Sequence, residues 1–477
     1  PTAEPTAEPT APSMVTQTAS PSGVASEAFR LNEDLADFWH CYLDKRAASR
    51  CMKQACGPDK NSVIAMEDKV ILHTMVDGLA AGAGAGAGRI LQLPILAYRE
   101  DGDGAETEPH GWSALDAFAR GAFPDGAPRM LFGKPKHLTI AVGATEFDLD
   151  SDYESPLQKN TIRQVRRYCD GDGEYLQKLR YRQIMYIAPL APVQEELTPA
   201  GRRVVPGHLV QPMYPAFGSG RVGPHPVDPA HQGNVAWRLM AGWYTNANGK
   251  RSPLELRVQV VWGRAHMVGL FGVGSDAVFL AFARPPAQGG VTSWTPVFAR
   301  EQIELLLFNY SIKHDPYFKA HPEVSMAATE GFKSKGPEGI GIGEVADYFR
   351  RFLHTVTAQA ELLASRLGLP FARFDFFVPP PGPRHAAWPP AFNELELECG
   401  FEWCRSLDAA EACEQALDQA LREGHARWAQ HGTTTSPKAV LAGFGCSGHA
   451  DLGAGAMDCT GAAVGQDTAS TDWYGKL

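Results

Sequence analysis

The chain of 477 residues is long enough for two or three packed lobes, and 44% of its residues are hydrophobic and 21% charged, as in a globular protein. Its net charge of −10 argues against nucleic acid or an anionic membrane surface as a partner. No run of about 20 apolar residues predicts a membrane span. The nine cysteines form no CxxC pair, which favours reduced thiols and a cytoplasmic location over a zinc site. A targeting segment upstream of Pro1 and the oligomeric state stay open.

The N-terminal part of the chain is expected to hold a tail, two helices and a glycine-rich insertion. Residues 1–25 repeat PTAE and contain almost no aliphatic bulk, which predicts a disordered Pro/Thr/Ala-rich tail. Apolar residues at helical spacing predict helices over 27–50 and 66–79. The GAGAGAG run from Gly82 to Gly88 looks like a phosphate loop, but no strand precedes it, so we expect a flexible insertion.

The middle of the chain carries strand patterns. Leu254–Val261 (LELRVQVV) is the clearest, because charged or polar residues alternate with apolar ones as in a half-buried strand. Further strands are expected at 129–142, 183–190, 208–213 and 276–283.

The C-terminal part is expected to be mainly helical around two short strands. Residues 313–343 are rich in Lys, Gly, Pro and Glu, which predicts a mobile loop. A long amphipathic helix is expected at 344–367, ending before Gly368 and Pro370. One more helix is expected at 408–431, and an irregular Gly/Ala/Thr-rich tail follows it.

Two segments after the long helix, FARFDFFV and FNELELECGF, carry the clearest chemistry. They predict two strands joined as a hairpin by a proline-rich stretch. Residues two apart on a strand share a face, so Arg373 lies beside Asp375 and Glu394 beside Glu396. Three carboxylates in one patch favour a cation among them, and oxygen ligands suit Mg²⁺. On these residues alone, an idle solvent-facing strand pair fits equally well.

With its neighbours, this hairpin resembles the end of the nucleotide-binding core in the ATP-grasp superfamily. R-x-D, with Asp375, and N-E-x-E, which begins at Asn393, are similar to the two metal-binding strands of that family. Glu396 stands where the family most often has Asn, and the proline-rich insertion makes the turn wider than in compact members.

Four upstream segments resemble family motifs in the same order. They are EDKVILHTMVDGL with Lys69, MLFGKPKHLTI with Lys134, HLVQPMYP with Gln211, and PLELRVQVVWGRAHMV with Arg257. The resemblance covers residues 66–403, and the motifs are most similar to those of TupA-like and carboxylate–amine ligase-type members.

The resemblance implies a role for particular side chains. They are Asp375, Glu394 and Glu396 for the metal, Arg257 and Arg373 for catalysis, and Lys69, Lys134, Lys136 and Gln211 for the nucleotide. The implied fold is α+β, the ATP-grasp fold, in which two α+β lobes clamp ATP between antiparallel sheets.

The resemblance also implies how the chain divides. The expected regions are the tail at 1–25, an N-terminal helical segment at 26–100, a small lobe at 101–213, a large lobe with the metal site at 214–407, and a C-terminal helix and tail at 408–477.

The function that the resemblance implies is that of an enzyme using ATP and Mg²⁺. A ligase that activates a carboxylate as an acylphosphate and joins it to an amine or thiol is the first hypothesis. A phosphotransferase (kinase) acting on a small molecule or saccharide is the second. A non-catalytic nucleotide-binding module is the third, and it suits the lack of an acidic ribose contact in AFGSGRVGPH.

Overall fold

The computed structural model shows a mixed helical and antiparallel-sheet architecture with two sheets. The structure describes residues 69–82, 90–100, 130–135, 145–148, 207–216, 234–246, 253–271, 278–284, 294–311, 316–382, 388–396, 404, 407–408 and 410–430. The expectations for the tail at 1–25, the helix at 27–50, the strand at 183–190, Lys136 and the end of the chain lie outside these residues.

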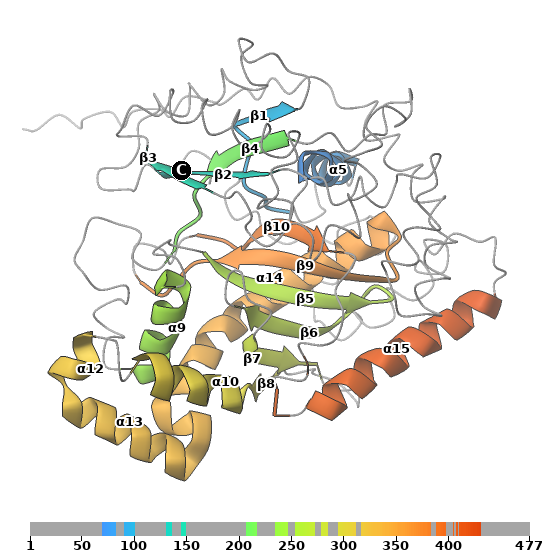
Figure 1. Ribbon diagram of the computed structural model, residues 1–477. Coiled ribbons are helices and arrows are strands. Elements are labelled where there is room, and N and C mark those ends of the chain that lie inside the picture. Colours follow the sequence, from blue (N-terminus) through green and yellow to red (C-terminus); the bar gives the residue numbers. More distant parts are fainter. Residues whose placement is uncertain are drawn as a thin grey trace, which may run out of the picture.

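The smaller sheet has four short antiparallel strands in the order β1-β4-β2-β3. They are β1 (Ala97–Glu100), β2 (Met130–Pro135), β3 (Thr145–Asp148) and β4 (Gly207–Pro212). Helix α5 (Lys69–Gly82) lies beside this sheet, and both lie on one side of the larger sheet (Figure 1). The expected strand at 208–213 is confirmed as β4, whereas β1 was not expected.

The larger sheet is also antiparallel, in the order β10-β9-β5-β6-β7-β8. Its strands are β5 (Leu254–Val261), β6 (Arg264–Phe271), β7 (Val278–Ala283), β8 (Thr295–Phe298), β9 (Phe371–Val378) and β10 (Ala391–Glu396). The strands expected at 254–261 and 276–283 are confirmed as β5 and β7. The predicted hairpin is confirmed too, since β9 and β10 pair as antiparallel neighbours.

A two-residue turn joins β5 to β6. Trp262 and Gly263 occupy it with φ angles of 48° and 75°, as the twist of a tight hairpin requires. A bulky residue rarely adopts positive φ, and here Trp262 is held by helix α15 (Ala410–Gln430). Its ring lies 6.0 Å from that of Trp428, and its indole nitrogen donates to the Leu421 carbonyl at 3.3 Å. The turn therefore docks α15 onto the sheet.

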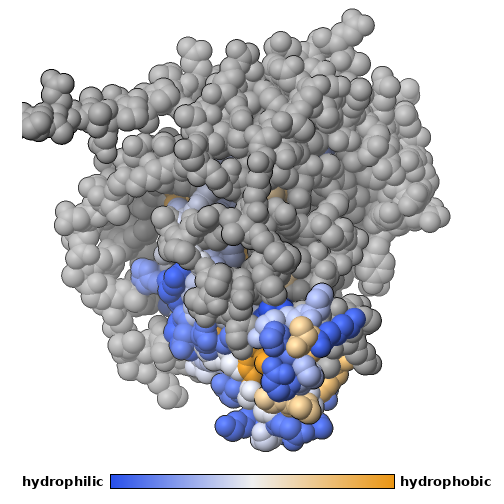
Figure 2. All heavy atoms as spheres, turned by 90° about the vertical axis from the view of Figure 1, so that its left-hand side faces the viewer, coloured by the Kyte–Doolittle hydropathy of each residue, from blue (hydrophilic) through white to orange (hydrophobic). Residues whose placement is uncertain are grey.

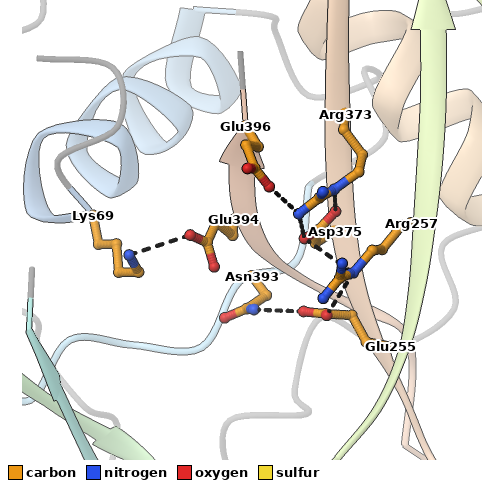
Figure 3. Close-up of polar contacts among 8 residues, drawn as sticks. All are labelled: Lys69, Glu255, Arg257, Arg373, Asp375, Asn393, Glu394 and Glu396. Atoms are coloured by element: carbon orange, nitrogen blue, oxygen red, sulfur yellow. Dashed lines mark hydrogen bonds and ion pairs between the residues drawn. The ribbon is translucent and has the colours of Figure 1, made fainter. Parts of the chain in front are cut away.

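The long helix α14 (Ile342–Leu367) packs against strands β5, β6 and β9. Alternation along each strand puts residues such as Leu256 and Phe374 into the hydrophobic core that includes α14. It leaves Arg257 and Asp375 on the opposite face, toward the small sheet and α5 (Figure 3). The core on one face thus fixes which side chains point toward the small sheet.

Six shorter helical segments belong to the described part of the chain between residues 235 and 340. They are α9 (Val235–Asn246), α10 (Arg300–Leu305), the π-helix η3 (Leu306–Ser311), α12 (Pro316–Ala320), α13 (Pro322–Lys335) and the 3₁₀-helix η4 (Gly336–Ile340). No helix in the described part of the chain is both long and apolar enough to cross a membrane.

The expectation of a mobile loop at 313–343 is wrong, because α12, α13 and η4 occupy most of it. Pro322 sits in the first turn of α13, where its missing N–H costs nothing. Phe318 and Phe332 are buried and anchor α12 and α13. Most other side chains of α13 face solvent, and one of them is the apolar Met326, which is 64% exposed. Figure 2 shows that the described residues on this side of the molecule are mainly hydrophilic, with some apolar ones among them. A loop-like composition therefore hid a polar surface helix.

The expectation of reduced thiols is wrong for one pair of cysteines. Cys404 and Cys413 form a disulfide and are both buried. The bond ties the segment after β10 to the first turns of α15. The nine-residue separation matches no metal or redox motif, so the sequence did not mark the pair.

Candidate functional site

A largely buried cluster of polar and charged side chains lies where α5 and the small sheet face the large sheet (Figure 3). Its members are Lys69 from α5, Lys134 from β2, Glu255 and Arg257 from β5, Arg373 and Asp375 from β9, and Asn393, Glu394 and Glu396 from β10. Asp375 is the most deeply buried at 1% exposure, whereas the Glu394 side chain keeps 21%. We call these nine residues the charged cluster.

Strand register assembles the part of the cluster on the large sheet. Asp375 on β9 is paired with Arg257 on one side and Glu394 on the other. Directly opposed residues point to the same face of a sheet, so these three form one row. Arg373 and Glu396 form the next row. The hairpin predicted to gather the carboxylates does so by this pairing.

Asn393 lies at an irregularity in β10, where the register shifts between Phe392 and Glu394. An extra residue in one strand re-aims side chains locally. Here the Asn393 amide nitrogen donates to Glu255 Oε1 at 2.9 Å, and its oxygen accepts from Lys134 Nζ at 2.8 Å. Asn393 therefore links Lys134 of the small sheet to Glu255 on β5 of the large sheet.

Arg373 holds two of the carboxylates. Its Nε and Nη2 donate to Asp375 Oδ1 and Oδ2, both at 2.8 Å. The same guanidinium forms an ion pair with Glu396. Bidentate pairing of this kind is both strong and directional, so it fixes the orientation of Asp375.

Arg257 makes a second bridge between carboxylates. Its Nε donates to Glu255 Oε2 at 3.1 Å and lies 3.6 Å from Asp375 Oδ2. Its guanidinium carbon is 4.3 Å from the centre of the Phe271 ring, a cation–π contact that holds the group in place.

Two lysines enter the cluster from outside the large sheet. Lys69 Nζ lies 3.3 Å from Glu394 Oε1, and Lys134 Nζ donates to Asn393. Both lysines are 8% exposed. Burial, and then the nearby Lys69, lower the pKa of Lys134 to about 8. Although burial raises the pKa of Glu394, Lys69, Lys134 and Arg373 together bring it below its ordinary value, so this carboxylate is ionised at neutral pH.

A hydrogen-bond network positions α5, and with it Lys69. Gln92 donates to Asp77 Oδ1 at 2.8 Å and to the His73 carbonyl at 2.9 Å. A His73 ring nitrogen lies 3.0 Å from the Leu93 carbonyl. The segment that carries these partners is fastened to β10 by an isolated bridge between Gln92 and Phe392. The helix is thus tied to the strand that carries Glu394.

Gln211 is one of the residues that the resemblance assigns to the nucleotide. It lies on β4, is 8% exposed, and donates its side-chain amide to the Leu93 carbonyl at 3.0 Å. It is not a member of the charged cluster. Its role toward a nucleotide stays a prediction.

The structure brings seven of the nine predicted site residues into the charged cluster, leaving out Gln211 and the undescribed Lys136. Asn393 and Glu255 are the other two members; neither is among the nine predicted site residues, although the resemblance makes Glu255 structural or close to the metal. Signals existed for both, because Asn393 precedes Glu394 in the strand motif and Glu255 shares a face with Arg257.

The donor chemistry of the three predicted metal ligands fits a hard divalent cation, since all are carboxylates. Among the described residues, however, no three His, Cys, Asp or Glu side chains are grouped as an open metal site. The carboxylates are instead paired with lysine and arginine. Their role as metal ligands stays a prediction.

Comparison with known proteins does not show a family for this chain. No protein-family model matches the sequence, and no curated protein is similar to it. Among solved structures, the crystal structure of D-cycloserine synthetase DcsG matches with 13% sequence identity and a TM-score of 0.27, covering 76% of this chain and 72% of that one. A likeness this distant carries no argument about the function of the chain.

Proposed function

We propose that the charged cluster binds ATP with Mg²⁺ and that the protein is an ATP-dependent ligase of the carboxylate–amine type. One observation carries the proposal: two buried lysines from outside the large sheet converge on a strand pair that offers Asp375, Glu394 and Glu396. Carboxylates are the ligands that a divalent cation prefers, and lysines are the side chains that bind phosphate oxygens. A triphosphate with a divalent cation supplies both signs at once.

The lysines, the arginines and the carboxylates of the charged cluster would have different roles. Lys69 and Lys134 would bind phosphate oxygens and orient the triphosphate. Arg257, held by Phe271, and Arg373 would stabilise the charge that spreads over the transferring phosphoryl group. Bound Mg²⁺, held by Asp375 with Glu394 and Glu396, would neutralise phosphate charge and template the transfer.

The ligase assignment follows from the resemblance of the motifs and from the arginines. A carboxylate acceptor needs cations to approach a triphosphate, and the two guanidiniums in the cluster can supply them. An oxygen of the acceptor carboxylate attacks the γ-phosphorus of ATP while the bond between that phosphorus and the oxygen of the departing ADP breaks. An amine or thiol then attacks the acylphosphate carbon, and phosphate leaves. No contact in the described residues favours a hydroxyl acceptor over a carboxylate.

Turnover with a trap for acylphosphates tests the proposal. The full chain is incubated with MgATP and single carboxylic acids from an amino-acid panel, each with hydroxylamine. We expect ADP, free phosphate and a hydroxamate to appear together for at least one acid, and Asp375→Asn to abolish all three while far-ultraviolet circular dichroism stays unchanged.

Other products would redirect the assignment. A phosphorylated acceptor without free phosphate would support the phosphotransferase instead. Nucleotide binding with no turnover across the panel would support a non-catalytic module. Unchanged activity in both Asp375→Asn and Glu394→Gln would contradict the predicted metal role.

A further inference from the structure

The charged cluster neutralises itself. It contains four carboxylates (Glu255, Asp375, Glu394 and Glu396) and four cations (Lys69, Lys134, Arg257 and Arg373). Each carboxylate lies against a cation, and the lysine that binds Asn393 is linked through it to Glu255. The numbers of opposite charges are therefore equal without any ligand.

We propose that this internal pairing makes a divalent cation and a nucleotide bind interdependently, each weakly alone and tightly together. The inference rests on the proposed function. A metal that takes a carboxylate removes one ion-pair partner from a buried lysine or arginine, and a phosphate that takes Lys69 removes the ion-pair partner of Glu394. Either loss leaves charge in the cluster less well compensated, which is unfavourable. When both ligands bind, each released group gains a new partner of opposite sign.

The pair Lys69–Glu394 is the place where this pairing can be released selectively. At 3.3 Å it is longer than the Arg373–Asp375 contacts of 2.8 Å. Glu394 also keeps the most exposed side chain among the cluster's ion pairs, at 21%. Lys69 stands on α5, so replacing it leaves the strand register of β9 and β10 untouched.

The experiment measures binding in three combinations with the full chain. Mn²⁺ is titrated alone and followed by electron paramagnetic resonance of the free ion. A non-hydrolysable ATP analogue is titrated in EDTA by calorimetry, and then each ligand is titrated in the presence of the other. In wild type we expect each to bind at least about tenfold more tightly when the other is present.

A lysine variant separates the pairing from the general affinity of Mn²⁺ for a nucleotide. Lys69→Met should strengthen the binding of Mn²⁺ alone by several-fold, because Glu394 loses its ion-pair partner, and should reduce the coupling between the ligands. Lys333→Met is the matched control, since Lys333 is exposed and its ion pair among the described residues is with Glu330 on α13; it should leave both quantities unchanged. Lys69→Gln repeats the test if the Met variant does not fold.

The outcomes separate this inference from the function on which it rests. Tight binding of Mn²⁺ alone to wild type, unaffected by the analogue, would overturn the inference while leaving a nucleotide site intact. So would a folded Lys69 variant whose affinity for Mn²⁺ alone is unchanged. Failure of the analogue to bind even with Mn²⁺ would overturn the proposed function and the inference with it.

Discussion

Lys134 on β2 donates a hydrogen bond of 2.8 Å to Asn393 on β10, and this contact joins the small sheet to the large one inside the charged cluster. The residues are 259 positions apart in the sequence. Asn393 also donates a hydrogen bond to Glu255 on β5. Lys134 is therefore linked through Asn393 to a strand inside the large sheet. Nucleotide binding should therefore depend on the charge state of Lys134.

That dependence predicts an effect of pH. The pKa of Lys134 is lowered to about 8, so the free protein loses this positive charge as pH rises through that value. Phosphates bind the charged form of Lys134, so nucleotide affinity should not depend on this lysine below about pH 7. The affinity should fall between about pH 8 and 10, and in that range Lys134 should take up a proton when the nucleotide binds. Calorimetry in buffers of different ionisation enthalpy measures both. Lys134→Arg, which stays charged, should remove the dependence; an unaltered profile in Lys134→Met would refute it.

A second prediction concerns the support beneath Arg257. A Cβ added at Gly269 would lie 2.5 Å from the Phe271 ring. That ring makes the cation–π contact with the Arg257 guanidinium. Gly269→Ala should therefore move the ring, lower nucleotide affinity about tenfold and cost about 1–3 kcal/mol of stability. Gly343→Ala is the control, because its Cβ would meet only the flexible end of a glutamate at 3.2 Å. Equal nucleotide affinities in the two variants would contradict this account of Arg257.

A third prediction concerns the anchor of α14. Glu361 Oε1 accepts from the Ala265 backbone nitrogen at 2.8 Å and from Arg284 Nη1 at 2.6 Å. Glu361→Leu removes the ion-pair partner of the part-buried Arg284 and the acceptor of the buried Ala265 amide, and should lower the free energy of unfolding by about 3–5 kcal/mol in urea titrations. Glu330→Gln, which breaks the exposed pair with Lys333, should cost less than about 1 kcal/mol. A small loss in Glu361→Leu would show that α14 is held by apolar packing alone.

A fourth prediction concerns acid stability. Burial first, and then Arg264 and Arg284, lower the pKa of His266 to about 4. The unfolded state, with a pKa of about 6.5, binds more protons between these values, so stability falls as pH drops from about 6.5 to 4, by up to about 3 kcal/mol. His266→Gln should flatten this part of the curve in urea unfolding at several pH values. A variant that parallels wild type would contradict the assignment.

The sequence predicted the parts of the fold whose pattern is local. The alternation of Leu254–Val261 and the amphipathic stripe before Gly368 correspond to β5 and α14 within two residues. The helix α13 was missed because Phe332 and few other residues reveal its buried side. Its remaining surface is polar, and composition alone resembles a loop.

The charged cluster could be predicted only in part, for a physical reason. Spacing of two on a strand places Arg373 with Asp375, but it cannot say which cation neutralises which carboxylate. That depends on contacts such as Lys69–Glu394, which join α5 to β10 across most of the chain. The bulge that turns Asn393 toward both sheets also depends on strand pairing, which no local pattern encodes.

The central claim is that Lys134 and Asp375, on two different sheets, serve one nucleotide–magnesium site. Calorimetric titration of a non-hydrolysable ATP analogue with Mg²⁺ into wild type, Lys134→Met, Asp375→Asn and the double variant tests it most directly. We expect each single change to weaken binding by at least about tenfold, and the double change to weaken it by less than the product of the two, as residues of one site do. Absence of binding in wild type, or wild-type affinity in both single variants, would contradict the claim.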